Sequence, residues 1–422
     1  MNQGWEKNVR GTKGRRGALA VLPVLLAAAV GCQAAPAKSG PDAKAPTPAK
    51  TGKPVFEEKL ADQLSAASRA TAGAGSARFT STVSYGAAGG AAVETTTGVL
   101  DYAKDTARAE RAYTVPRGFP RTAAEELGRT VGAQGREVFG VEKNDVLYRT
   151  SGGTWLRYAS SGSMEFVKGV GDIMGLAGEY GPWGGTLADL VRGADPERAP
   201  ETGADGRRTY RVEVAGRDVV RLLPRFVRYP GADAQLPATV PMTVVLDAEG
   251  RLLSARLDGT PLLSGLRKAG VMEGVTSLTL DYVLTGHGGQ TVPGVPAGER
   301  TEDAEKSVVD LTSLKPGACG SKDTGLGFVD KLREVPCGPS ADLRVFAQKR
   351  VETTVRNKEP KGVGRGIATE YCRRTFPTVP QWTKDAKPRG AFSTMGGEHI
   401  SYSLTDPDST VSGDFTCYVS LR

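Results

Sequence analysis

The residues with the clearest chemical use are the five cysteines, and Cys32 stands apart from the other four. It directly follows an apolar run over residues 18–31, and a basic segment precedes that run. This order is typical of an export signal, because a helix that spans a bilayer needs roughly 20 apolar residues and the run is shorter. The thiol of Cys32 would then begin the exported chain, where it could carry acyl groups.

The four residues Ala29-Val-Gly-Cys32 resemble a bacterial lipobox, in which small residues before the cysteine let the signal peptidase approach. We therefore expect a lipoprotein signal peptide over residues 1–31, covalent diacylglycerol and palmitate on Cys32, and a Pro/Ala/Lys tether over residues 32–55. An ordinary secretory signal with an unmodified cysteine is the alternative. The pair Arg15-Arg16 leaves Sec and twin-arginine export both open. Acyl chains would anchor the protein on the extracytoplasmic face of the cell membrane.

Composition argues against nucleic-acid binding and against a recognisable enzyme. The formal net charge is +8, but part of it lies in the expected signal peptide, and no basic block alternates with aromatic residues. The chain has two histidines, His287 and His399, and neither stands beside a nucleophile in a known motif. The glycine-rich segment 169–175 lacks the spacing of a phosphate-binding loop. We expect a non-enzymatic protein with no metal and no cofactor besides its covalent lipid.

Apolar periodicity predicts a helix followed by an antiparallel sheet. Glycines end the helical pattern near residue 73. Before them, apolar residues recur at helical spacing at Phe56, Leu60, Leu64, Ala67 and Ala70. Alternating apolar and polar residues predict strands, and a turn at residues 247–250 joins two of them into a hairpin. The expected strands are residues 77–85, 138–141, 146–148, 154–158, 242–246, 253–257 and 278–284. This arrangement indicates an α+β fold with helices on one face of the sheet.

Large apolar side chains gather between residues 155 and 191, and within residues 164–192 glycines divide the chain into segments that should form short helices. Two interpretations stay open: the side chains fill the core beneath the sheet, or they line an apolar pocket suited to alkyl chains. The candidate lipid-binding residues are Trp155, Phe166, Ile173, Met174, Leu176, Tyr180 and Trp183.

Several short stretches within residues 56–297 share the pattern of a known family. They are the opening helix, Ser76-Ala-Arg-Phe-Thr80, Gly98-Val-Leu-Asp-Tyr102, Asp145-Val-Leu-Tyr148 before Trp155, and Pro241–Leu252. In this order they resemble the LolA-like lipoprotein domains, including the actinobacterial LppX and LprG type. The resemblance implies an antiparallel half-barrel sheet wrapped around helices, with an apolar cavity that accepts acyl chains.

The last four cysteines all follow residue 300 and mark a second domain. An even number in an exported chain predicts two disulfides, and no Cys-x-x-Cys pair suggests zinc. The stretches Leu314–Cys319, Val335–Val345 and Cys372–Phe376 resemble the small extracytoplasmic domain called septum-formation related. That family has Pro-His and an acid after its second cysteine, whereas this chain has Pro339-Ser340 and Arg344 there.

This resemblance places a small disulfide-bonded α+β domain at residues 308–422, after a linker at residues 298–307. Of the three possible connectivities we favour the sequential one, which joins Cys319 to Cys337 and Cys372 to Cys417. Cys372 shares a helical face with Ile367, Ala368 and Tyr371, and Cys417 shares a strand face with Phe415, Val419 and Leu421. Both Cys372 and Cys417 should therefore point inward.

The sequence leaves two hypotheses about function. In the first, a membrane-anchored lipoprotein of the cell envelope binds or carries a lipid or other acylated molecule in its half-barrel. In the second, the half-barrel is a filled scaffold, and the disulfide domain contacts an envelope protein or a wall partner. An open apolar cavity would favour the first hypothesis, and a packed interior would favour the second.

Overall fold

The computed structural model describes residues 54–142, 145–159, 186–231, 234–326, 330–356, 359–379, 392–402 and 408–421. The expected signal peptide, the lipidated Cys32 and nearly all of the tether lie outside these ranges and stay predictions. Among the described residues, none of the helices has the length and apolar character needed to cross a membrane.

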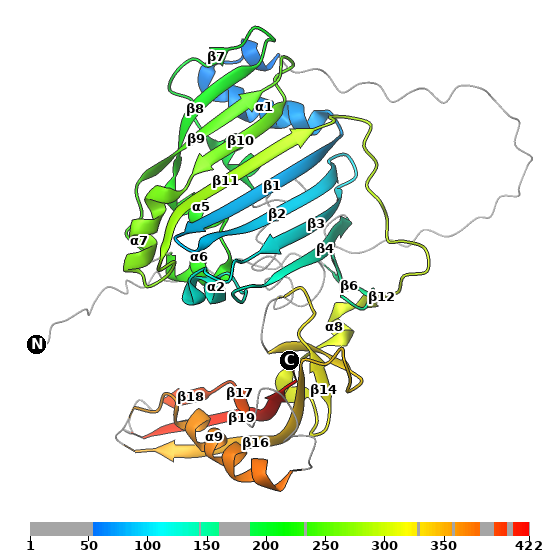
Figure 1. Ribbon diagram of the computed structural model, residues 1–422, viewed down its shortest axis with the longest axis vertical. Helices are drawn as coiled ribbons and strands as arrows, with labels where there is room; N and C mark the ends of the chain where they lie inside the picture. The colour runs from blue at the N-terminus through cyan, green and yellow to red at the C-terminus, as the bar shows by residue number, and fades with distance from the viewer. Residues whose placement is uncertain are drawn as a thin grey trace, which may run out of the picture. The chain divides into compact units, whose positions relative to one another are not determined.

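Most of the described chain up to residue 303 forms one curled sheet, which is antiparallel except where β12 runs parallel to β6 (Figure 1). The described strands follow one another in the order β12-β6-β5-β4-β3-β2-β1-β11-β10-β9-β8-β7. Their bounds are β1 (Ser76–Ala87), β2 (Gly90–Asp101), β3 (Thr106–Thr114), β4 (Gln134–Glu142), β5 (Asp145–Arg149), β6 (Trp155–Tyr158), β7 (Glu201–Thr202), β8 (Arg208–Ala215), β9 (Thr239–Leu246), β10 (Leu252–Asp258), β11 (Val275–Thr285) and β12 (Thr301–Asp303). This half-barrel contains every strand predicted between residues 77 and 284.

Alternation along the strands gives the half-barrel an inner, buried face. On β1, Phe79 is 3 % exposed and stacks on Tyr282 of β11, with 6.1 Å between ring centroids, whereas Arg78 is exposed. Gly98 lies opposite Phe79 on β2, and a Cβ there would lie only 2.5 Å from the Phe79 ring. The inward positions of β8 to β11 are aliphatic or aromatic as well, and they form one core with the helices.

Short helices pack against the inner face at β8 to β11, beside the turn-like helices η1 (Val55–Glu57), η2 (Leu60–Asp62) and η3 (Thr260–Leu262). The α-helices of this region are α1 (Gln63–Gly73), α2 (Arg121–Glu126), α4 (Leu187–Gly193), α5 (Gly216–Val220), α6 (Arg225–Gly231) and α7 (Leu263–Lys268). Thr186 caps α4 in a reciprocal capping box with Asp189. The helix expected within residues 164–192 is therefore present at α4, while residues 160–185 lie outside the described residues.

The opening helix begins later than the periodicity predicts. Residues 55–62 form the two 3-10 turns η1 and η2, and α1 begins only at Gln63. The cause is tertiary: Val55 packs on the hairpin turn at Gly250, and the Arg208 guanidinium lies 3.7 Å from the centroid of the Phe56 ring. The predicted end of the helix at Gly73 is correct.

The residues that the sequence predicts as a linker contain regular structure. Thr301–Asp303 form β12, which pairs with β6, and α8 (Ala304–Ser307) follows directly. Ala304 and Val308 are buried in the same core as the half-barrel. The chain therefore passes from the first sheet to the second through packed elements.

The C-terminal region forms a second sheet with β13 and β17 toward its edges and the long pair β16 and β19 between them. Its elements are β13 (Val308–Asp310), η4 (Leu311–Ser313), β14 (Cys319–Ser321), β15 (Lys331–Val335), β16 (Leu343–Val355), α9 (Val363–Thr375), η5 (Phe376–Thr378), β17 (Ser393–Gly396), β18 (His399–Tyr402) and β19 (Ser409–Ser420). Cys319 is bonded to Cys337, and Cys372 of α9 is bonded to Cys417 of β19, which is the pairing that the sequence predicts.

One part of the predicted α9 face is wrong. Ala368 and Cys372 are fully buried, and Cys417 is buried as expected, but Ile367 and Tyr371 are 38 % and 36 % exposed. The helix therefore buries a narrower stripe than the sequence pattern suggests, because small side chains let it lie close to the sheet. A Cβ at Gly364 of α9 would already lie 3.2 Å from Val411 of β19.

Candidate functional site on the inner face of the half-barrel

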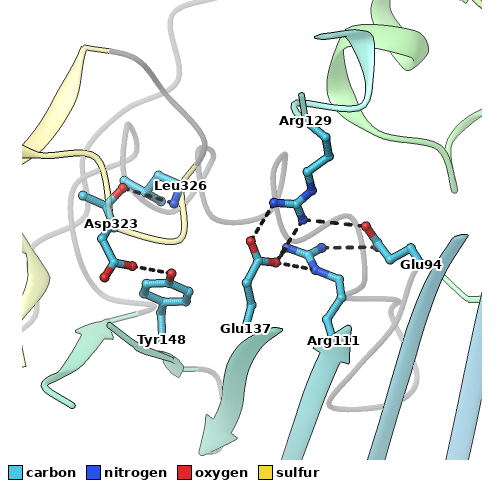
Figure 2. A network of polar contacts seen from close by, with 8 residues as sticks. Glu94, Arg111, Arg129, Glu137, Tyr148, Asp323 and Leu326 are labelled. Carbon is cyan, nitrogen blue, oxygen red and sulfur yellow. Dashed lines mark hydrogen bonds and ion pairs between the residues drawn. The ribbon is translucent and has the colours of Figure 1, made fainter. Parts of the chain in front are cut away.

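The inner face changes character between its two halves. At β8 to β11 it is aliphatic and covered by helices, whereas at β2 to β4 it carries charged side chains. On β3, the positions that face inward are Ala107, Ala109, Arg111 and Tyr113. Arg111 lies directly opposite Glu137 of β4 in the strand register. Glu94 of β2 and Arg129, which follows α2, complete the group (Figure 2).

The four charged residues form a tight network. The Arg111 guanidinium lies 2.6 Å from one Glu137 carboxylate oxygen, and Arg129 Nη1 lies 2.8 Å from the other oxygen (Figure 2). Glu94 is more distant, at 3.6 Å from Arg111 and 3.8 Å from Arg129. The side chains of Arg111, Arg129 and Glu137 are only 13–18 % exposed. Glu137 is therefore the shared acceptor for both guanidinium groups.

Neighbouring charges keep Glu137 and Arg111 of this network ionised despite their burial. Burial opposes ionisation of Glu137, but the positive charges of Arg111 and Arg129 outweigh it and hold its pKa at about 2. Burial likewise disfavours the charged form of Arg111, yet Glu94 and Glu137 raise its pKa above the ordinary value. Two cations and two anions thus balance. Arg129 Nε is buried and finds no hydrogen-bond acceptor among the described residues, which leaves one donor unsatisfied.

Aromatic rings surround the network. The Arg111 guanidinium lies 4.8 Å from the centroid of the Phe139 ring, and the Arg129 guanidinium lies 3.7 Å from that of Tyr113. Phe139 in turn contacts Tyr148 of β5, with 5.4 Å between centroids. The planar cations are therefore held by both carboxylates and ring faces. Such a surface can contact apolar groups and also offer a hydrogen bond to a polar one.

A loop of the C-terminal region closes onto the inner face beside this network. The Tyr148 hydroxyl donates to Asp323 Oδ1 at 2.5 Å (Figure 2), and the Ser151 amide donates to Asp323 Oδ2 at 2.6 Å. The Tyr158 hydroxyl donates to the Thr324 carbonyl, and Leu326 is buried in the half-barrel core. A side chain at Gly325 would clash with Tyr148, since a Cβ would lie 2.5 Å from the ring.

The structure corrects the placement of one candidate lipid-binding residue. Trp155 alternates with Leu156 and Tyr158, which face the inner core, so its ring lies on the outer face of β6. It is 2 % exposed, the Arg108 guanidinium lies 4.2 Å from the ring centroid, and its indole N–H donates to Glu299 at 2.5 Å. The other candidates lie outside the described residues and stay predictions, namely Phe166, Ile173, Met174, Leu176, Tyr180 and Trp183.

Neither histidine belongs to this network. His287 follows β11, where its Nε2 is 3.1 Å from the Leu252 carbonyl and burial lowers its pKa. His399 is exposed at the start of β18. Within the described ranges, no group of three or more His, Cys, Asp or Glu side chains has the geometry to hold a metal ion.

The sequence reasoning missed Glu94, Arg111, Arg129 and Glu137 as a group. The available signal was local: Thr106–Thr114 places Ala, Ala, Arg and Tyr on one face of a strand, and an arginine on an otherwise small and apolar face indicates a buried ion pair. Its partner Glu137 lies 26 residues away, and only the strand register identifies it.

Comparison of the chain with known proteins finds similarity to solved structures at 10–12 % identity. No family model matches it, and no curated protein matches it. Among solved structures, MucB in complex with MucA(peri) is 12 % identical, with 84 % of this chain and 92 % of that chain covered and a TM-score of 0.23. A DUF1329 family protein from Desulfovibrio piger is 10 % identical, with 56 % and 96 % covered and a TM-score of 0.22.

A further similar structure is an outer-membrane lipoprotein-sorting protein domain from Vibrio parahaemolyticus. It is 10 % identical, 53 % of this chain and 89 % of that chain are covered, and the TM-score is 0.19. At TM-scores between 0.19 and 0.23 these similarities carry no argument about function. The functional conclusions therefore rest on the residues of this chain.

Proposed function

We propose that this chain is a non-enzymatic, lipid-anchored protein of the cell envelope that binds an acylated molecule on the inner face of its half-barrel. One observation carries the proposal: two guanidinium groups, packed on aromatic rings, lie on the same inner face as the extended aliphatic core. This combination suits a molecule with an apolar chain and a polar end.

The apolar part of the ligand would supply most of the affinity. Alkyl chains buried against the inner face would gain about 25 cal/mol for each Å² of apolar surface removed from water. Glu137 already forms ion pairs with Arg111 and Arg129, so the network offers little net charge to a ligand. The unsatisfied Arg129 Nε favours a carbonyl or hydroxyl oxygen as the polar end.

The anchor would give this binding surface its location. Acylation of Cys32 would keep the half-barrel beside a membrane, and the tether over residues 32–55 would let it reach the lipid surface. The proposal assigns no bond making or breaking to the protein.

Lipid extraction tests this function. The full chain with Cys32→Ser is purified without detergent, denatured and extracted with organic solvent, and the extract is analysed by mass spectrometry. We expect one acylated species at a defined ratio to protein, and a lower ratio in the Arg129→Gln variant. Arg136→Gln is the matched control, because Arg136 of β4 is 75 % exposed and should leave the ratio unchanged.

The alternative function is an envelope interaction protein whose C-terminal domain contacts a protein or wall partner. Two observations favour it. The inner face at β8 to β11 is packed against helices rather than open, over the residues that the structure describes. The exposed Ile367 and Tyr371 on α9 also lie one helical turn apart and present apolar surface beside a disulfide-bonded core. An extract with no more lipid than that of an unrelated soluble protein would reject the first function and leave this one.

A further inference from the structure

The outer face of the half-barrel holds a pocket of its own. Its volume is about 900 Å³, within the range of small-molecule sites. Outward side chains of β3 to β6 form its floor, the turn between β2 and β3 forms one wall, and residues 291–294 form another. Its charged floor residues Arg108 and Arg157 point outward, because they alternate with the inward positions of the same strands. The core residues Ala107 and Val141 also border the pocket.

A crossing segment bounds this pocket, and we call residues 286–300 the strap. At one end the amides of Gly288 and Gln290 donate to the carbonyl and hydroxyl of Ser76, at 2.7 and 2.8 Å. At the other end Glu299 binds the Arg149 guanidinium at 2.7 Å and the Trp155 indole. Between these anchors the Arg108 Nε donates to the Pro293 carbonyl at 3.2 Å. The strap therefore stands over the pocket as a fixed structure.

Arg108 is held in place without an ion pair to any described residue. Its guanidinium lies over the Trp155 ring and beside Gly140, where a Cβ would come within 2.9 Å of Nη1. It makes no ion pair with any residue in the described ranges, and its Nη1 is buried without a hydrogen-bond acceptor there. Burial lowers the pKa of Arg108, although Glu142 and Glu299 oppose this effect from a longer distance. A desolvated cation of this kind favours a negative charge nearby.

The remaining charged groups of the pocket already have partners. Lys104 binds Asp101 at 2.9 Å. Arg157 binds Glu142 at 2.8 Å and Asp145 at 3.2 Å. Arg108 is therefore the lining cation that makes no ion pair among the described residues, and Glu142 and Glu299 act on it only from a longer distance.

We propose that this pocket binds a small organic molecule through an anionic group, a carboxylate or a phosphate monoester, that pairs with Arg108. A volume of about 900 Å³ exceeds what a lone inorganic anion fills, so the anionic group belongs to a larger molecule. The guanidinium is already oriented by Trp155, Gly140 and the Pro293 carbonyl, and binding loses little side-chain freedom. This site is independent of lipid binding on the inner face.

Calorimetric titration of the purified full chain tests the site with three probes: glycerol 3-phosphate, glycerate and glycerol. The two anions distinguish phosphate from carboxylate recognition, and glycerol is the neutral control. We expect saturable binding of at least one anion, none of glycerol, and at least a tenfold weaker affinity in Arg108→Gln. Arg136→Gln, on the neighbouring strand and 75 % exposed, should keep the wild-type affinity.

A second variant guards against a folding defect in Arg108→Gln. In Gly140→Ala the new methyl group displaces the guanidinium while the charge stays, so anion affinity should fall although the protein retains its circular dichroism and thermal transition. The proposal is overturned if neither anion binds up to about 10 mM, far weaker than the affinities of specific sites. It is also overturned if both variants bind the anion as tightly as the wild type does.

Discussion

Strand β3 presents two arginines to opposite faces of one sheet, and their surroundings differ in kind. Arg111 faces inward, lies 2.6 Å from Glu137 and has a raised pKa. Arg108 faces outward, stacks on Trp155, has no ion pair among the described residues and has a pKa lowered by burial. The first cation is neutralised by the protein itself. The second is oriented by its neighbours but makes no ion pair among the described residues.

This difference shows how a charged side chain that stabilises the fold can be distinguished from one that is available to bind a ligand. A buried ion pair whose partners are both supplied by the chain contributes to the fold, and removing one partner leaves the other unpaired. A fixed cation beside a pocket contributes little to the fold but can attract a ligand. The same Arg→Gln substitution should therefore lower the stability of the fold on the inner face of β3 and lower ligand affinity on the outer face.

The largest expected effect is on the inner face. Arg111→Gln leaves Glu137 and Glu94 with only Arg129, so the free energy of unfolding should fall by about 3–5 kcal/mol. Urea unfolding followed by circular dichroism measures it. Arg136→Gln is the control, because its pair with Glu110 is exposed and should contribute at most about 1 kcal/mol. A loss for Arg111→Gln no greater than that of the control would show that the network is not structural.

Local patterns in the sequence predicted the strands well. Period-two alternation at residues 77–85 and 278–284 and the hairpin at residues 242–257 correspond to β1, β11 and the pair β9 and β10. These patterns succeed because one buried face imposes alternation on every strand that contributes to it. The sequential disulfide pairing was also predicted, since few cysteines were available.

Features set by distant contacts were not predictable. Trp155 was assigned to the interior because it is large and apolar, yet it is buried on the outer face by Glu299 of the strap. The prediction that the first helix begins at Phe56 was wrong for the same reason, because Val55 packs against the distant turn at Gly250. The residues near Tyr148 in the sequence give no indication that its hydroxyl binds Asp323, which lies 175 residues further along the chain. Such pairings depend on register and topology, which a single sequence does not display.

The second-largest expected effect is a change with pH in the stability that Glu137 contributes. The pKa of Glu137 in the folded protein is about 2, below its ordinary value of 4.5, so ionised Glu137 stabilises the fold. That stabilisation, on the order of 3 kcal/mol, is complete above about pH 4.5 and is lost as the pH falls toward 2. The difference in unfolding free energy between wild type and Glu137→Gln should therefore shrink from pH 7 to pH 3.

Urea titrations at both pH values measure this difference, and Glu110→Gln serves as the control because Glu110 is 43 % exposed. The control should show only a small difference at either pH, because its pair with Arg136 is exposed. A Glu137→Gln difference that stays constant between pH 7 and pH 3 would mean that the carboxylate titrates normally, and that the arginines do not hold it.

The smallest expected effect is on the outer face. Arg108→Gln removes a cation that makes no ion pair among the described residues, so the free energy of unfolding should fall by only about 1 kcal/mol, the size of the lost contacts with the Trp155 ring and the Pro293 carbonyl. Arg149→Gln on the same face is the comparison, because it leaves Glu299 without its guanidinium and should cost more. If Arg108→Gln destabilised the protein as much as Arg111→Gln does, Arg108 would be a structural residue. The contrast between the two faces of β3 would then disappear, because both arginines would serve the fold.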